Sequence, residues 1–215
     1  MKRSIYRGLL AAGLIACSAS IQAADLYKVE MVVFANLNSD DGGEYWPDLA
    51  PVDTAGSLSL APWDGYPLQR FEQLPTGDLV LGGDAAALSR SANYALLYHK
   101  GWLQPITGPS SSPSIRVNAS FEDYELNGTL RIYKQRYLHA QPLLQLNSIA
   151  LSSGYTPQPA AVEAPDASEG SAEVTTAPVQ PHRWQLEQSR RMRSEETHYI
   201  DHPKMGILLH VRPVE

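Results

Sequence analysis

The chain has 215 residues, with 23 acidic and 17 basic side chains and a formal net charge of −6 at pH 7. An acidic surface repels the phosphate backbone, so this charge balance argues against nucleic acid as a partner. The length is sufficient for one domain with a hydrophobic core of its own.

The first 23 residues have the pattern of a secretory signal peptide. Three basic residues lie within 1–7, the apolar run GLLAAGLIAC follows at 8–17, and Ala23 ends a small-residue cleavage site. An apolar run of about ten residues is too short to span a bilayer, which needs roughly 20. We therefore expect an exported chain that is cleaved after Ala23, does not span the membrane and forms a single domain over 24–215.

A second processing route stays open. Residues 14–17, LIAC, also fit a loose lipoprotein box, which would place a lipid anchor on Cys17. Cleavage after Ala23 would instead remove Cys17, the only cysteine, and with it any disulfide or zinc–thiolate site. The same cleavage removes three basic residues and no acidic one, so 14 basic and 23 acidic residues remain, a formal charge of −9.

The first half of the mature chain predicts a strand, an irregular segment and a helix. LYKVEMVVFA at 26–35 mixes alternation with β-branched residues, which predicts a buried strand. Residues 36–83 are rich in Asp, Gly and Pro and carry spaced aromatic residues, so we expect a long irregular segment anchored by aromatic packing. DAAALSRS at 84–91 predicts a short helix with Asp84 near its N-cap.

The second half predicts mainly strands. Alternating sequence indicates strands at 94–106 and 114–121, then two strands within 124–151 with a turn at Pro142, and further strands at 184–193 and 205–212. Residues 156–181 contain almost no large apolar side chain and predict a long disordered loop. The fold class that follows is α+β, with a single antiparallel twisted sheet, one or few short helices and that loop.

Arginines are concentrated at the start of the segment SRRMRSEETHYIDHPKM, residues 189–205. In an extended chain, the two-residue period places Arg191 and Arg193 on one face and Arg190 on the other. Neighbouring guanidinium groups suit bidentate capture of carboxylates or phosphates. The alternative is a solvated structural network in which these arginines pair with Glu195, Glu196 or Asp201.

The second half of the same segment contains His198, Asp201 and His202, which together resemble a zinc ligand set. The spacing lacks the glutamate of a helical zinc protease motif, and the strand period places Asp201 opposite the two histidines. The chain has no GxSxG or SxxK motif. The acids at 122–125 fall in a turn-like sequence, so they do not suggest a glycosidase pair.

Several blocks of sequence, taken in order, resemble one family. They are YKVEMVVFAN at 27–36, YALLYHKGWLQPI at 94–106, ELNGTLRIYKQRYLHAQPLLQL at 125–146 and SRRMRSEETHYIDHPKMGILLHVRP at 189–213. The order RYLH, RRMRS, HY and DHP resembles the CsiV family of periplasmic peptidoglycan-binding proteins of gammaproteobacteria. The similarity is weakest over 36–69 and 156–181, and Thr197 stands where many relatives have an apolar residue.

The resemblance implies a periplasmic, non-enzymatic protein without a cofactor. It implies binding to peptidoglycan and support of cell-wall synthesis through a penicillin-binding protein and its outer-membrane lipoprotein activator. It supplies no ligand-contact residues, so the site must be inferred from chemistry: aromatic rings can stack on sugars, and arginines can bind stem-peptide carboxylates. The candidate binding residues are Trp102, Arg136, Tyr137, His139, Arg190, Arg191, Arg193, His198, Tyr199, Asp201 and His202.

Two other functions stay open. One is a metal-dependent or wall-cleaving envelope enzyme that uses His198, Asp201 and His202. The other is a protein-binding envelope module without affinity for glycan.

Overall fold

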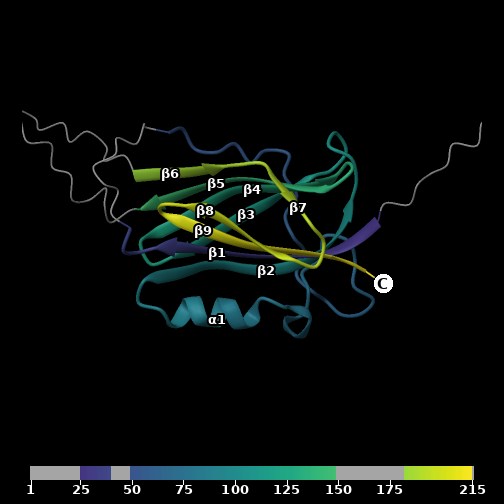
Figure 1. Cartoon of the computed structure of the whole chain (residues 1–215), viewed down its shortest axis with the longest axis horizontal. Coiled ribbons are helices and arrows are strands. Elements are labelled where there is room, and N and C mark those ends of the chain that lie inside the picture. Colours follow the sequence, from purple (N-terminus) through teal and green to yellow (C-terminus); the bar gives the residue numbers. More distant parts are fainter. Residues whose placement is uncertain (1–24, 40–48, 149–181, 215) are drawn as a thin grey trace, which may run out of the picture.

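Two antiparallel sheets dominate the computed structural model, which describes residues 25–39, 49–148 and 182–214 (Figure 1). The first sheet has the strand order β2-β1-β9-β8, formed by Tyr94–Ile106, Asp25–Asn36, Met205–Pro213 and Thr197–His202. The second has the order β3-β4-β5-β6, formed by Ser114–Phe121, Tyr124–Lys134, Leu138–Ser148 and His182–Glu187, and β7, Arg190–Met192, also pairs with β5.

The prediction of a single sheet, and with it the α+β class, is therefore wrong: the described part of the chain is mainly β, with two sheets and one α-helix. Alternation in a sequence shows that a strand has one apolar face, but not which strands become its hydrogen-bonded neighbours. Here the two sheets face each other and bury their apolar faces together, which a single sheet cannot do.

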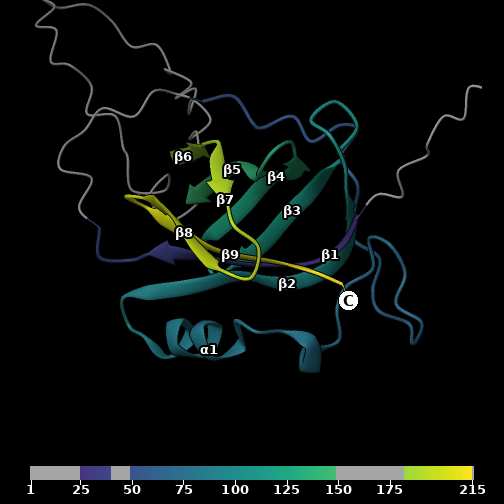
Figure 2. The ribbon, with the colours of Figure 1, turned by 45° about the vertical axis from the view of Figure 1, so that its right-hand side comes forward.

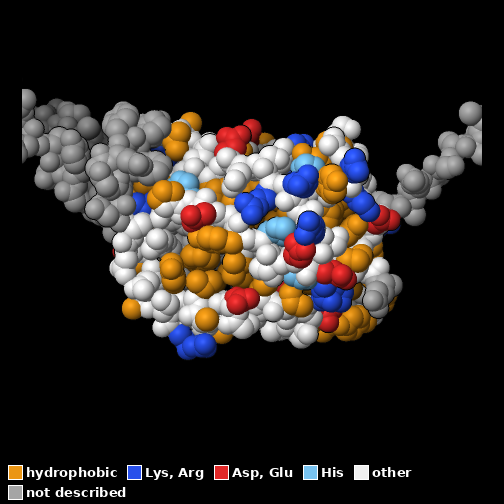
Figure 3. All heavy atoms as spheres, viewed as in Figure 1, with side chains coloured by type: hydrophobic (Ala, Val, Ile, Leu, Met, Phe, Trp, Pro, Cys, Tyr) orange, Lys and Arg blue, Asp and Glu red, His pale blue; other side chains and the backbone are white. Residues whose placement is uncertain are grey.

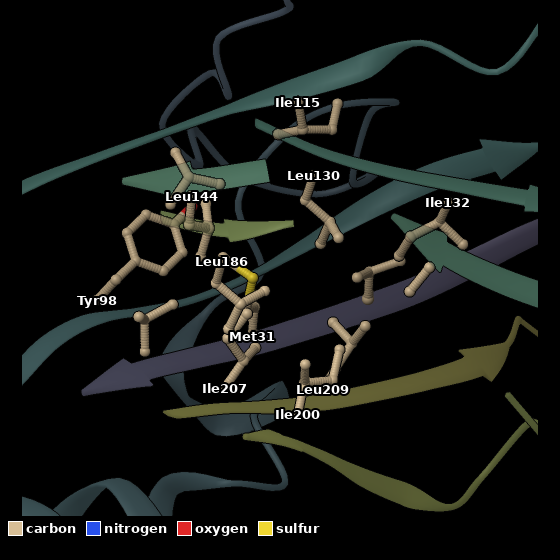
Figure 4. Close-up of a cluster of buried hydrophobic side chains, with 14 of the residues drawn as sticks. Met31, Tyr98, Ile115, Leu130, Ile132, Leu144, Leu186, Ile200, Ile207 and Leu209 are labelled. Atoms are coloured by element: carbon tan, nitrogen blue, oxygen red, sulfur yellow. The ribbon is translucent and has the colours of Figure 1, made fainter. Parts of the chain in front are cut away.

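The core lies between the two sheets and draws on nearly every strand. Met31, Ile207 and Leu209 from the first sheet meet Leu130 and Leu144 from the second, and all five are essentially inaccessible to solvent (Figure 4). Because successive strand residues point to opposite sides, this burial turns the intervening residues outward.

The outer face of the first sheet is covered in part by the helix α1, Gly82–Arg90 (Figure 2). Ala85 of the helix packs against Val32 of β1. The segment that leads into the helix is held by Glu30, whose buried carboxylate accepts hydrogen bonds from the backbone of Val80 (2.7 Å) and Leu81 (3.0 Å) and lies 2.7 Å from His99 Nε2. Burial by itself would raise the pKa of Glu30, yet these hydrogen bonds hold the pKa below its ordinary value.

Pro142 lies inside β5, so the prediction that it marks a turn is wrong. The turn between β4 and β5 instead spans residues 135–137, where the Gln135 N–H donates to the Tyr137 carbonyl. Pro142 is tolerated because its backbone faces the point at which β6 ends and β7 has not begun. There its carbonyl accepts a hydrogen bond from Gln188 N (3.3 Å), and no ladder position of β6 or β7 calls for its missing N–H.

The single strand predicted at 184–193 is wrong, because the chain forms two strands there, β6 and β7, with a break in pairing at residues 188–189. The remaining predicted elements agree with the structure. The predicted strands at 94–106 and 114–121 match β2 and β3, and those at 26–35 and 205–212 match β1 and β9 to within one residue. The predicted helix corresponds to α1, with Asp84 in its first turn. Residues 49–75 are irregular, as expected. The predicted signal peptide and disordered loop lie outside the described residues, and within these residues no helix has the length and apolarity needed to cross a bilayer.

The substitution Glu30→Gln is expected to lower the free energy of unfolding by about 2 kcal/mol at pH 7, because an amide cannot accept all the hydrogen bonds of the buried carboxylate. The folded pKa lies below 4.5, so the stabilisation is present above about pH 4.5 and is lost as the pH falls through the folded pKa. Urea unfolding at pH 7 and in acid should show the difference from wild type shrinking in acid. Glu125→Gln, at an exposed carboxylate on β4, is the control, and equal loss from both variants at pH 7 would contradict the anchoring role.

Candidate functional site

The outer face of the second sheet carries a row of aromatic and cationic side chains. Pairing places Tyr133 of β4 beside His139 of β5, and His139 beside Arg191 of β7. The rings of Tyr133 and His139 are stacked, with centroids 5.1 Å apart and planes within 6°. We call Tyr133, Tyr137, His139 and Arg191 the outer row.

Tyr137 lies in the β4–β5 turn, beside the end of this row. The guanidinium carbon of Arg191 is 4.9 Å from the centroid of the Tyr137 ring, and that of Arg136 is 5.5 Å away. Both distances are within the range of cation–π attraction, and Tyr137 remains 42% exposed. The turn and β7, which are far apart in sequence, thus present one tyrosine with two guanidinium groups at the surface.

A cleft of about 530 Å³ opens beside Tyr137 along β7 and the turn that follows it. Its lining includes three arginines, Arg190, Arg191 and Arg193, and one acid, Glu196. Figure 3 shows Lys and Arg side chains gathered in this region of the surface, with histidine among them. We call it the cationic cleft.

A second cleft, of about 580 Å³, adjoins the first and shares Gln188 and Ser189 with it. Five of its nine lining residues carry a hydroxyl or an amide, with one cation, one acid and two apolar residues: Ser114, Thr129, Arg131, Gln141, Pro142, Leu143, Glu187, Gln188 and Ser189. Arg131 is already engaged, because its Nε donates to Gln141 Oε1 (3.1 Å) and its Nη1 to the Pro109 carbonyl (3.3 Å). We call it the polar cleft.

The family model CsiV, described as a peptidoglycan-binding protein, matches residues 9–214. The chain belongs to the CsiV family. No match was found among curated proteins or among solved structures.

The predicted site residues of this CsiV protein do not form one cluster. Seven of them come together at the outer row and the cationic cleft: Arg136, Tyr137, His139, Arg190, Arg191, Arg193 and His198. Trp102, in contrast, is fully buried in the core, and its indole N–H donates to Gln104 Oε1 (2.9 Å). A ring enclosed in the core cannot stack on a ligand, so Trp102 is removed from the candidate site.

Arg193 directly follows β7, and His198 is the second residue of β8, so the turn between the two strands lies between them. Since β7 ends at Met192, Arg193 does not share a strand face with Arg191; its side chain is exposed and lies 3.5 Å from Glu196. Arg193 therefore follows the alternative given above, in which an arginine pairs with a nearby acid at the solvated surface. His198 Nε2 lies 3.1 Å from the backbone nitrogen of Arg193 and 3.3 Å from its carbonyl oxygen, so the ring braces the turn in either tautomer.

Tyr199 and Asp201 lie on the outer face of the first sheet, away from the outer row. The Tyr199 hydroxyl donates to Asp201 Oδ1 (2.6 Å), and the ring stacks on Phe34 with centroids 6.3 Å apart. Burial, together with this hydrogen bond, raises the pKa of Tyr199 to about 12. The rings of Tyr94 and Phe34 are packed edge to face, with centroids 5.1 Å apart. We call Phe34, Tyr94 and Tyr199 the tyrosine surface.

His202 ends β8, where its Nδ1 accepts a hydrogen bond from Lys204 N (3.1 Å). Burial lowers the pKa of His202, and the nearby Asp201 offsets this only in part. The strand period puts His198 and His202 on one side of β8 and Asp201 on the other, as expected. The described residues contain no group of three or more potential ligands that could hold a metal ion.

Sequence reasoning missed Tyr133, Arg131 and the polar cleft. The cause was the wrong position of the turn between the two strands. The sequence prediction placed this turn at Pro142, which put Tyr133 and His139 on the same strand, whereas in the structure they face each other across a hairpin. QRY at 135–137 is a polar interruption between two alternating runs and marks the true turn.

Purified protein is expected to contain far less than one equivalent of zinc, because His198, Asp201 and His202 hydrogen-bond to separate partners and do not converge. Elemental analysis after removal of loosely bound metal by gel filtration is the measurement. One zinc per chain that disappears in His198→Ala and His202→Ala, but stays in His210→Ala, would restore the metal-enzyme hypothesis.

Proposed function

We propose that this CsiV protein binds peptidoglycan through the outer row and the two adjoining clefts. The observation that supports this most directly is the Tyr137 ring, exposed and flanked by the guanidinium groups of Arg136 and Arg191. An exposed tyrosine offers a flat apolar face to a sugar, and guanidinium groups bind carboxylates. The two clefts add hydroxyl and amide groups suited to a polar polymer.

The proposed role is binding without catalysis. The reactive side chains of the C-terminal segment hold the fold: His198 braces a turn, Asp201 accepts from Tyr199, and His202 accepts from Lys204. Glycan cleavage needs two carboxylates facing one cleft, whereas the lining of the cationic cleft has only one, Glu196. Its histidine, His198, is held against the backbone of Arg193.

We further propose that the protein acts in the periplasm, after export by the N-terminal segment, and supports cell-wall synthesis through a penicillin-binding protein and its outer-membrane lipoprotein activator. The tyrosine surface supports a protein-contact role of this kind. Tyr199 is 47% exposed there, and Figure 3 shows an apolar area bordered by charged side chains. Aromatic side chains within a polar rim are typical of surfaces that bind proteins.

A protein-binding module without affinity for glycan remains the second candidate, and the same tyrosine surface favours it. The two candidates differ in whether the second sheet binds the cell wall at all or the first sheet alone makes the functional contact. Each face offers one exposed tyrosine whose removal leaves the core intact, so a pair of variants can separate them.

The double substitution Tyr137→Ala with Arg191→Ala is expected to weaken retention by purified sacculi about tenfold or more, because one stacking surface and one carboxylate donor are lost. The matched control is Tyr199→Ala with Arg90→Ala, which removes the same residue types from the first sheet and from α1. Co-sedimentation at several sacculus concentrations is the measurement, with circular dichroism to confirm folding. Loss of binding in the control alone would move the site to the first sheet.

Capture of a purified synthase and its activator is expected to show the reverse dependence. Tyr199→Ala should weaken capture several-fold, because a half-exposed aromatic in a contact is often an energetic centre, and Tyr137→Ala should leave capture unchanged. Capture that is unaffected by Tyr199→Ala would reject the tyrosine surface as the contact. Capture by a wild-type protein that fails to sediment with sacculi would favour the protein-binding module.

A further inference from the structure

The cationic cleft holds positive charge that its surroundings do not neutralise. Arg193 has Glu196 nearby, at 3.5 Å, but both side chains are largely exposed and such pairs contribute little. Within the described part of the chain, neither Arg190 nor Arg191 has an acidic side chain at ion-pair distance. An otherwise acidic protein thus keeps two guanidinium groups unpaired in one cleft.

Contact with the Tyr137 ring orders the guanidinium group of Arg191. The Arg191 guanidinium carbon is 4.9 Å from the ring centroid, so the ring restricts the conformations of a side chain that would otherwise sample many. The ring offers a guanidinium no hydrogen-bond acceptor oxygen, so N–H groups of Arg191 remain to donate to a ligand. Two parallel N–H groups on one edge of a guanidinium match the two oxygens of a carboxylate.

The polar cleft has the opposite character. Its cation, Arg131, already donates to Gln141 and Pro109, and its acid, Glu187, balances the charge. Hydroxyl and amide groups make up much of the remaining lining, and these suit a neutral ligand with many hydroxyl and acetamido groups. The two clefts meet at Gln188 and Ser189, so one polymer segment can lie across both.

We infer that the arginines of the cationic cleft bind the carboxylates of the stem peptide, while the exposed part of Tyr137 and the neighbouring polar cleft receive the sugars. This rests on the proposed binding of peptidoglycan. The chemistry of the polymer supports the division, because its amino sugars are uncharged and its anionic groups are concentrated in the peptides. Binding a neutral sugar against an unpaired arginine would remove water from the guanidinium without supplying an anion in exchange. A carboxylate compensates for the lost water, so unpaired arginines favour an anionic ligand.

Three preparations of cell wall test the inference with the full mature protein. They are intact sacculi, sacculi whose peptide carboxylates have been converted to amides with carbodiimide and ammonia, and glycan strands freed of peptide by an amidase. Affinity for the amidated sacculi should fall about tenfold or more relative to intact sacculi, since charge-assisted hydrogen bonds are lost. Glycan strands should bind as weakly as the amidated sacculi, and added salt should weaken only the binding to intact sacculi.

Variants locate the effect. Arg191→Ala should bind intact sacculi about as weakly as wild type binds amidated sacculi, and should lose little further affinity on amidation. Arg191→Lys keeps the charge but not the planar donor edge, so it should fall in between. Arg90→Ala on α1 is the matched control, because it removes one positive charge far from the cleft and should behave like wild type.

The outcomes separate this inference from the proposed function. Equal binding of wild type to intact and amidated sacculi would overturn the carboxylate assignment and leave peptidoglycan binding standing. Failure to bind intact sacculi at all would overturn both. An equal loss from Arg191→Ala and Arg90→Ala would show that net charge matters and the cleft does not, which also overturns the inference.

Discussion

The two sheets bury their apolar faces against each other, and this packing fixes which side chains reach the surface. Every residue that points into this core fixes the direction of its neighbours, because strand side chains alternate. Register follows from the same packing. At Gly128 of β4, an added Cβ would lie 2.1 Å from the Leu143 carbonyl oxygen, so only glycine permits this approach of β4 to β5. That register places Tyr133 beside His139 and so forms the outer row.

The clefts owe their position to an interruption in the same sheet. Pro142 cannot donate a backbone hydrogen bond toward β6 and β7, and the chain leaves β5 at Gln188 and Ser189 before it pairs again as β7. Both clefts include these two residues in their lining. The sheet loses two pairing positions at this break. The break leaves a polar surface beside the Tyr137 ring.

Charge is distributed unequally over the two faces of the molecule. On the first sheet, the buried Glu30 carboxylate is spent on anchoring the segment before α1, and Lys28 pairs with Asp78 at 2.6 Å. On the second, Lys134 pairs with Asp25 and Arg131 bonds to an amide, but Arg191 contacts a tyrosine ring and is not neutralised by a carboxylate. The charges named on the first sheet hold the fold, while Arg191 on the second remains available to an anion. This asymmetry is why we assign anion binding to the second sheet.

The amino-acid sequence alone determined the family, because the family is recognised from the order of residues along the chain. It also determined most of the strands, the helix and the alternation along β8, because these depend on neighbouring residues and on the two-residue period of a strand. It did not determine the partition into two sheets, the burial of Trp102 or the separation of Tyr199 from Arg191. A tryptophan flanked by alternating residues looks alike on either face of a strand, and residues eight apart reach different sheets once a turn intervenes. Those outcomes depend on which strands pair and which faces pack together, and contacts between distant segments decide both.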